Sequence, residues 1–99
     1  MDIKELQQWV AEDWRERSRH FPSPDQQLLL LVEEVGELAE AIRKQDGRKA
    51  RKITASDIGS EIADVVISVL TVANTHNIDV SAEIERFKSR LRQRQEAGF

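Results

Sequence analysis

The chain has 99 residues and a net charge of −3, with 18 acidic and 15 basic side chains. It contains no cysteine, which excludes disulfides, zinc–thiolate sites and cysteine nucleophiles. No apolar run approaches the roughly 20 residues that span a bilayer, and a negative net charge disfavours a nucleic-acid groove. We therefore expect one domain over residues 1–99, cytoplasmic, with neither a membrane nor a nucleic acid as partner.

The first half of the chain predicts two helices. Over residues 2–19, apolar side chains recur at three- and four-residue steps, at Ile3, Leu6, Val10 and Trp14. Ser23, Pro24 and Gln26 then predict an N-cap, a proline in the first turn and a capping box. The second helix is expected to run from there to about residue 45 and to end at Asp46–Gly47. Its predicted apolar stripe is Leu28, Leu31, Val32, Val35, Leu38, Ala39 and Ile42.

A basic segment follows the second helix. Residues 43–52 contain Arg43, Lys44, Arg48, Lys49, Arg51 and Lys52. Such a run is usually a solvated loop; the alternative is a lid or flap that attracts phosphate groups.

The second half predicts two more helices, at about 56–76 and 80–96. The third helix is apolar around most of its circumference, so it should be buried nearly all round. Because one chain of this length can hardly surround it, we expect a homo-oligomer. The fourth helix is expected to be capped by Asp79 or Ser81 and to turn Ile84, Phe87 and Leu91 inward. No strand alternation occurs, so the predicted fold class is all-α.

Two pairs of acidic side chains lie in unusual positions. Glu61 and Asp64 are three residues apart on one face of the apolar third helix, and Glu34 and Glu37 repeat this spacing on the second. If the two helices pack together, the four carboxylates repel one another unless a cation lies among them. Oxygen ligands of this kind favour Mg²⁺, or Mn²⁺ as a substitute, over zinc. The alternative is that they form an ordinary solvated face.

The stretches around these acids resemble a known family. The segment Glu33-Glu34-Val35-Gly36-Glu37 and the segment Glu61-Ile62-Ala63-Asp64, with 23 residues between Glu37 and Glu61, are similar to the motifs of the MazG-like all-α nucleoside triphosphate pyrophosphohydrolases. The resemblance covers residues 6–94. It implies a four-helix MazG-type bundle completed by homo-oligomerisation, with a tetramer (a dimer of dimers) favoured over a dimer.

The resemblance also implies an activity and a metal site. Relatives cleave a nucleoside triphosphate between the α- and β-phosphates, which yields the monophosphate and pyrophosphate. By resemblance, Mg²⁺ is the cofactor, its ligands are Glu34, Glu37, Glu61 and Asp64, and Glu33 is a further acid nearby. Glu34 and Glu37 are both candidates for the catalytic base that takes a proton from water, and the choice between them stays open.

Substrate contacts are implied less directly. Lys88, Arg92 and Arg94 on the fourth helix are the candidates for binding the phosphates, although an exposed basic face is the alternative for Lys88 and Arg92. Phe87 and Leu91 stand where many relatives have a lysine and an asparagine, and a one-residue shift puts Lys88 close to the first of these. The candidates for binding the base are Trp14, His20 and Phe21; the alternative for Trp14 is a place in the core, because it continues the apolar stripe of the first helix.

Three other functions compete with a nucleotide-pool house-cleaning hydrolase. A phosphoribosyl-ATP pyrophosphatase would share the metal acids and differ in the pocket. A non-catalytic helical interaction module would need neither metal nor substrate, but all four ligand-type residues are present. A DNA-binding helical dimer is disfavoured by the acidic charge and the lack of a basic recognition helix.

Overall fold

The computed structural model describes residues 1–17, 20–45 and 55–98, and within these ranges it contains helices and no strand. The helices are α1 (Ile3–Arg17), α2 (Pro24–Arg43), α3 (Ala55–Thr75) and α4 (Val80–Glu96). The all-α prediction is confirmed, and the predicted bounds agree to within about two residues. The predicted stop at Asp46–Gly47 and the basic residues from Arg48 onward lie outside the described residues.

The predicted N-caps of α2 and α4 are both present. The Ser23 hydroxyl accepts a hydrogen bond from the Gln26 backbone N–H at 3.2 Å, and the Ser23 N–H donates to the Gln26 side chain at 2.9 Å. This reciprocal pair is the predicted capping box. Of the two candidates for α4, Asp79 is the cap, because its carboxylate accepts from the Ala82 N–H at 3.1 Å.

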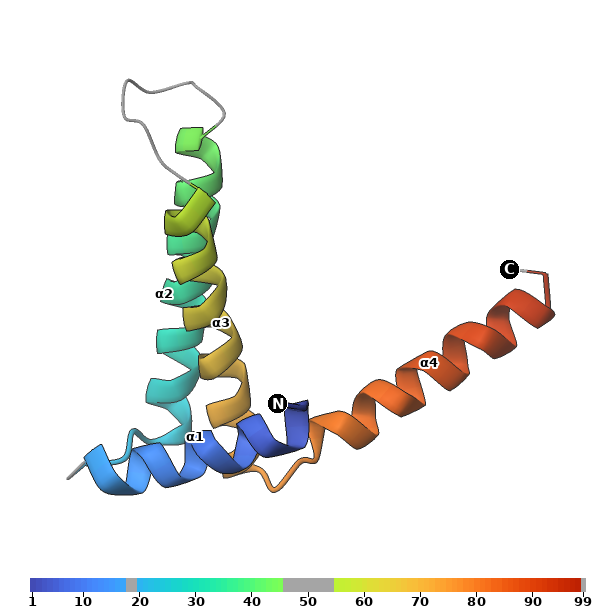
Figure 1. Cartoon of the computed structure of the whole chain (residues 1–99), viewed down its shortest axis with the longest axis horizontal. Helices are drawn as coiled ribbons and strands as arrows, with labels where there is room; N and C mark the ends of the chain where they lie inside the picture. The colour runs from blue at the N-terminus through green and yellow to red at the C-terminus, as the bar shows by residue number, and fades with distance from the viewer. Residues whose placement is uncertain (18–19, 46–54, 99) are drawn as a thin grey trace.

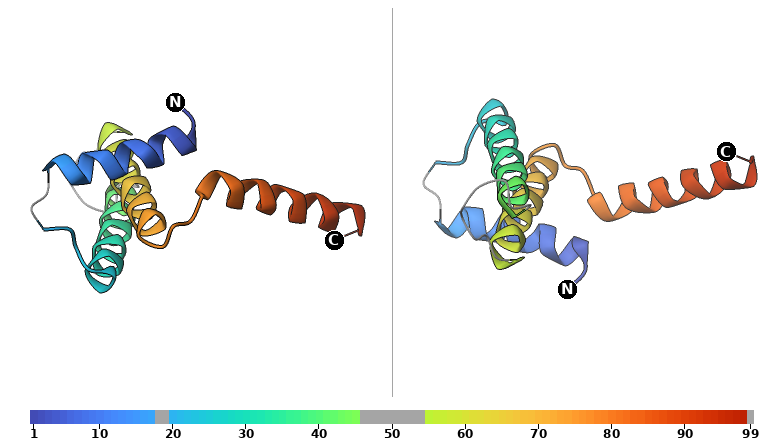
Figure 2. Two further views of the ribbon diagram at one scale, coloured as in Figure 1. Left: turned by 90° about the horizontal axis from the view of Figure 1, so that it is seen from below. Right: turned by 90° about the horizontal axis from the view of Figure 1, so that it is seen from above.

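α2 and α3 form a helical hairpin, and α1 and α4 are attached to one end of it. α2 and α3 run antiparallel, side by side, and α1 crosses the base of this hairpin (Figure 1). α4 leaves the same end and runs away from the other three helices, as all views show (Figure 2). The small core lies where α1 meets α3, around Val10, Leu70 and Ala73, which are 1%, 4% and 6% exposed.

One buried glutamine on α1 fixes the turn between α3 and α4. The Gln7 amide nitrogen donates to the Asn74 side chain at 3.1 Å and to the Ile78 carbonyl at 2.9 Å. Its oxygen accepts from the Val80 N–H at 2.9 Å, and Asn74 donates back to the Gln7 carbonyl at 3.0 Å. Within this turn Asn77 adopts a left-handed conformation (φ 56°), which asparagine tolerates better than most residues. The direction of α4 is thus set by hydrogen bonds from α1.

The expectation that α4 turns its apolar residues inward is wrong within one chain. Ile84, Phe87 and Leu91 are 38%, 56% and 43% exposed, because α4 runs away from the hairpin instead of packing on it. The radius of gyration is 16.8 Å, against about 12.6 Å for a compact chain of this length. The four helices do not close into a bundle on their own.

The predicted apolar stripe of α2 is also largely exposed. Leu28, Val32 and Val35 are 59%, 60% and 48% exposed. The side of α2 with lower exposure is one helical position away, at Gln27, Leu31, Glu34, Leu38 and Ala41. α2 therefore has a second apolar side that this chain leaves uncovered.

α3 is likewise apolar on both sides. Ile62, Val66 and Val69 remain 41–47% exposed, whereas Leu70 and Ala73 are buried. By length and composition, the segment Asp57–Thr75 is the single described helix that could cross a membrane. The core helix of a soluble protein meets the same criterion, and this one carries Asp57, Glu61 and Asp64.

Candidate active site

The packing of α2 on α3 brings carboxylates from both helices together. Glu34 on α2 and Glu61 and Asp64 on α3 each offer one oxygen, and these three oxygens lie within 4.8 Å of one another. Glu61 and Asp64 share a face because they are three residues apart on a helix. Glu34 joins them because it lies on the side of α2 that packs against α3. Three of the four predicted metal ligands therefore form one cluster.

The electrostatics of the cluster are those of crowded like charges. Burial raises the pKa of Glu34, and the carboxylates of Glu37, Asp64 and Glu61 raise it further. Burial also raises the pKa of Glu61, with further increases from the charges of Glu37 and Asp64 and from hydrogen bonding to Glu37. Glu37 is exposed, so it lies at the rim of the cluster and interacts with both half-buried acids. Glu33 is exposed as well and acts on Glu34 more weakly.

Two carboxylate oxygens of the cluster have no hydrogen-bond partner in the described part of the chain. Glu34 Oε2 and Glu61 Oε2 are buried and accept no hydrogen bond from any described residue. A buried carboxylate oxygen without a donor is costly unless a cation compensates it. Neighbouring oxygens around one octahedral Mg²⁺ lie about 3 Å apart, so side-chain rotations would bring these ligands to that spacing. The residues thus fit a hard divalent cation.

A cavity of about 530 Å³ opens between α1, α3 and the segment before α2. It is lined by Ala11, Trp14, Arg15, Phe21, Thr71, Asn74 and Thr75. The rings of Trp14 and Phe21 meet edge to face, with centroids 5.3 Å apart. Two of the three residues predicted to bind a base therefore line one cavity. The third, His20, is exposed and is not among its described lining residues.

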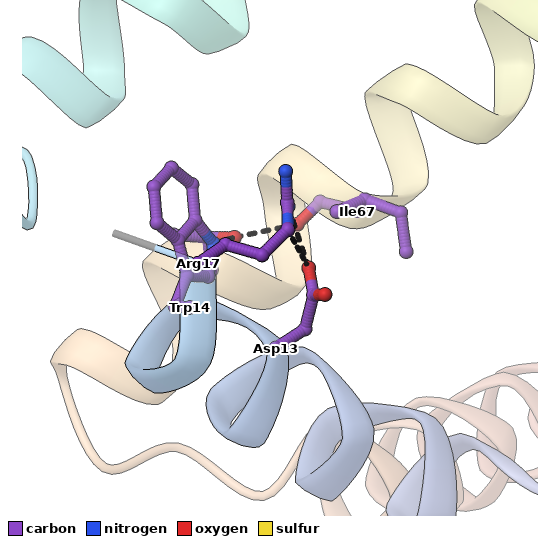
Figure 3. Close-up of polar contacts among 5 residues, drawn as sticks. Asp13, Trp14, Arg17 and Ile67 are labelled. Carbon is purple, nitrogen blue, oxygen red and sulfur yellow. Dashed lines mark hydrogen bonds and ion pairs between the residues drawn. The ribbon is translucent and has the colours of Figure 1, made fainter. Parts of the chain in front are cut away.

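Hydrogen bonds hold the Trp14 ring in place. Its indole N–H donates to the Thr71 hydroxyl at 3.0 Å, and this hydroxyl donates to the Ile67 carbonyl at 2.9 Å. The Arg17 guanidinium lies 5.8 Å from the centre of the Trp14 ring and donates to Asp13 at 2.8 Å (Figure 3). The aromatic wall of the cavity is thereby fixed relative to α3.

The cavity and the carboxylate cluster share one face of α3. Thr71 follows Asp64 by seven residues, which turns the helix almost twice and advances it by about 10 Å. Thr75, one turn further, continues the same face. Reasoning from sequence missed Arg15, Thr71, Asn74 and Thr75 as lining residues. The signal for the two threonines was present, because they extend the polar sector of Glu61, Asp64 and Ser68.

The predicted phosphate ligands lie elsewhere. Lys88, Arg92 and Arg94 belong to α4, which points away from the hairpin that carries the carboxylates (Figure 1). All three are exposed, and Lys88 forms an ion pair with Glu85 at 3.2 Å. Within one chain the structure does not bring these residues to the carboxylate cluster.

The fold and the cluster together define a small all-helical protein with a carboxylate site suited to a divalent cation. The MazG nucleotide pyrophosphohydrolase domain matches residues 22–99. The chain belongs to this family. The matched region contains α2, α3, α4 and the acidic residues of the cluster. It is accordingly a hydrolase of the nucleotide pyrophosphohydrolase type.

Solved structures agree with this assignment. The Bacillus-conserved MazG protein, a nucleotide pyrophosphohydrolase, superposes with a TM-score of 0.78 at 24% identity, over 92% of this chain and 90% of that one. YPJD from Bacillus subtilis, named as a pyrophosphatase, gives 0.78 at 25% identity, over 92% and 93%. iMazG from Vibrio DAT 722 gives 0.62 at 29% identity, over 94% and 99%. No curated protein matches the chain.

Proposed function

We propose that the chain is a Mg²⁺-dependent enzyme that cleaves a nucleoside triphosphate between the α- and β-phosphates and releases the monophosphate and pyrophosphate. Two observations carry this proposal: one carboxylate oxygen from each of Glu34, Glu61 and Asp64 lies within 4.8 Å of the others, and Glu34 and Glu61 each have a buried oxygen without a hydrogen-bond partner among the described residues. A triphosphate is strongly anionic, so an acidic site can accept it only together with cations.

The proposed ligands are Glu34, Glu37, Glu61 and Asp64. When bound, Mg²⁺ or Mn²⁺ would offset phosphate charge and acidify a water molecule. Glu34, Glu61 and Asp64 form the compact part of the set. Glu37, exposed at the rim, can either complete the ligand set or take the proton from the attacking water. Glu34 is the other candidate base, and a carboxyl with a raised pKa is better suited to accept that proton.

The proposed base site is the cavity beside Trp14 and Phe21. Its position on the same face of α3, about 10 Å beyond Asp64, matches an extended nucleotide whose phosphates lie at the carboxylates. Aromatic rings supply the flat apolar surface on which a base stacks. His20 stays in this proposal as a residue at the entrance, because it directly precedes Phe21.

A homo-oligomer is part of the proposal. The solvent-accessible surface is 7941 Å², whereas a folded monomer of this mass exposes about 5,800 Å². The excess lies partly on apolar residues of α2, α3 and α4, such as Val32, Val66 and Phe87, which are 60%, 42% and 56% exposed. Exposed apolar surface of this extent is typical of a subunit interface. A tetramer, as a dimer of dimers, is our preferred assembly.

Charge supports a particular role for α4 in that assembly. α4 carries five basic and three acidic side chains, whereas α2 and α3 together carry eight acidic and one basic. Docking of α4 on the hairpin of a second copy would cover Ile84, Phe87 and Leu91. It would also carry Lys88, Arg92 and Arg94 toward carboxylates that form no ion pair with any cation in the described part of the chain.

In the cell, we propose that the enzyme acts in the cytoplasm and removes unwanted nucleotides from the precursor pool. The substrate and the compartment follow from the proposed reaction, because nucleoside triphosphates are cytoplasmic metabolites. Neither a nucleic acid nor a membrane is required by this role.

The test is pyrophosphate release from a panel of canonical and modified nucleoside triphosphates with Mg²⁺, with and without EDTA. Chromatography should find the monophosphate and pyrophosphate as products, and no diphosphate. Asp64→Asn should lower the rate by about 100-fold or more, because several kcal/mol of charge stabilisation are lost, and should leave the helical content unchanged. Glu5→Gln, an exposed acid on α1, is the matched control and should keep full activity.

Three results would contradict the proposal. The first is turnover that persists in EDTA, the second is a diphosphate product, and the third is full activity of Asp64→Asn. If no nucleotide is hydrolysed although calorimetry shows that the folded protein binds Mg²⁺, the hydrolase assignment for these substrates fails.

A further inference from the structure

We propose that Arg15 selects the base, and that the cavity takes nucleoside triphosphates whose base presents a carbonyl oxygen, such as uracil or hypoxanthine, in preference to those that present an amino group at the same position. This inference rests on the proposed function for the identity of the substrate. It depends on which polar groups of the cavity still have hydrogen-bonding capacity.

Most polar groups around the cavity are already engaged within the protein. The Trp14 N–H is used by Thr71, and the Thr71 hydroxyl is used by the Ile67 carbonyl. The Thr75 hydroxyl, which has one hydrogen, lies within reach of the Gln27 side chain at 2.9 Å and the Thr71 carbonyl at 3.1 Å. None of these three groups has a hydrogen left to offer a ligand.

The Asn74 amide also forms hydrogen bonds within the protein, but it keeps some hydrogen-bonding capacity. One N–H of its amide donates to the Gln7 carbonyl, and its oxygen accepts from the Gln7 side chain. This leaves one N–H and one lone pair. An amide with one donor and one acceptor is complementary to the donor–acceptor edge of any base, so Asn74 can orient a base without selecting one.

Arg15 is the lining residue with the largest unused capacity. Its Nε donates to the Ala11 carbonyl at the long distance of 3.4 Å, and both terminal nitrogens lack a partner among the described residues. Its neighbour Arg17, in contrast, is occupied by Asp13. Among the described lining residues, Arg15 is thus the one cation, and it lies in a cavity that also has two aromatic rings in its wall.

Guanidinium groups only donate hydrogen bonds. A carbonyl oxygen on the base accepts them, whereas an amino group in the same position presents donor against donor and leaves both groups unpaired. A site that depends on such a bond rejects the analogue strongly, because the cost of an unpaired polar group adds to the lost bond. A hydrogen bond to a charged donor gives a preference of about tenfold or more.

The experiment compares substrates that differ chiefly at that one edge. The specificity constant kcat/KM is measured for dUTP and dCTP, and for dITP and dATP, with wild type, Arg15→Met and Arg15→Lys. We expect the ratio of keto to amino substrate to be about ten or more in wild type, near one in Arg15→Met, and partly restored in Arg15→Lys. Lys4→Gln, on the same face of α1 but three turns earlier, removes a charge outside the cavity and should leave the ratio unchanged.

A second readout needs neither metal nor turnover. In a Trp9→Phe background Trp14 is the sole tryptophan, so its fluorescence reports ligands in the cavity. Quenching by dUMP at lower concentration than by dCMP, with the difference abolished by Arg15→Met, supports the assignment even if no triphosphate is hydrolysed. In that case the hydrolase proposal alone has failed.

Two outcomes would overturn the inference while the hydrolase proposal survives. In the first, Arg15→Met lowers kcat/KM equally for keto and amino substrates, which would make Arg15 a phosphate ligand. In the second, wild type hydrolyses dCTP as well as dUTP, or better, and Arg15→Met leaves the ratio unchanged.

Discussion

At the scale of single residues, the structure separates two kinds of buried polar group. Glu34 and Glu61 each keep a buried oxygen that has no partner among residues 1–17, 20–45 and 55–98, as expected of residues that a ligand completes. Gln7 is equally polar and 8% exposed, yet both ends of its amide are satisfied by the turn between α3 and α4. The first kind marks a site and the second holds the fold together.

Gln7→Leu should therefore destabilise the protein without removing a residue of the carboxylate cluster. The variant loses the hydrogen bonds to Asn74, Ile78 and Val80 and leaves these polar groups unpaired, at a cost of about 2–3 kcal/mol. Chemical denaturation measures this change in the free energy of unfolding. Gln8→Leu is the control, because Gln8 is exposed on the next position of the same helix and should change stability by less than about 0.5 kcal/mol. Equal stability of the two variants would mean that the Gln7 bonds do not fix α4.

At the scale of helices, α2 and α3 each have two apolar sides. One side of each is used within the chain, and the other remains uncovered. This explains why α3 is apolar around most of its circumference although Ile62, Val66 and Val69 stay more than 40% exposed in one chain. A helix of this composition is stable in water only when something covers its second side.

Val69→Asp tests whether that cover is a second copy. Because Val69 is 41% exposed, an aspartate should be tolerated by the isolated chain, and circular dichroism should show the same helical content. In an interface the unpaired charge costs about 3 kcal/mol or more, so the dissociation constant should rise by about 100-fold or more. Light scattering coupled to size exclusion measures the assembly. Ser60→Asp, on another face of α3, should leave it intact.

An assembly that is unchanged in Val69→Asp would refute an interface at this face. If the wild type is monomeric and the variant unfolds, Val69 stabilises the fold of the single chain and not an interface.

At the scale of the whole molecule, the raised pKa values of the carboxylate cluster couple stability to pH. The pKa of Glu34 and that of Glu61 are raised above their ordinary value of 4.5 by burial and by neighbouring carboxylates. The folded chain thus holds these protons more tightly than the unfolded chain. Their stabilising contribution is complete below pH 4.5 and is lost as the pH rises through the higher folded pKa values.

Mg²⁺ should compensate for this loss, because it binds the folded cluster in its ionised form. We expect millimolar Mg²⁺ to raise the melting temperature by several degrees at pH 8 and by much less at pH 5, as measured by calorimetry. Glu61→Gln removes one of the repelling charges and one ligand. Its metal-free form should depend less on pH than wild type, and its response to Mg²⁺ should be weaker. A larger effect of Mg²⁺ at pH 5 than at pH 8 would exclude binding by ionised carboxylates.

The sequence by itself determined the four helices, the capping box at Ser23 and the acids of the carboxylate cluster. These features are local: they depend on three- and four-residue periodicity and on side chains that bond within one turn. Membership in the MazG family could also be predicted from the sequence, because each acid pair lies with its neighbouring residues in one short segment of the chain.

Only the tertiary structure decided where α4 points and which residues line the cavity. Gln7 and Asn74 are 67 residues apart, and Trp14 and Thr71 are 57 apart. No local pattern encodes such pairs, because each depends on how α1 crosses the hairpin. The same reason explains the error for Ile84, Phe87 and Leu91: periodicity identifies the apolar side of a helix, whereas the surface that covers it is set by packing between distant segments, or between chains.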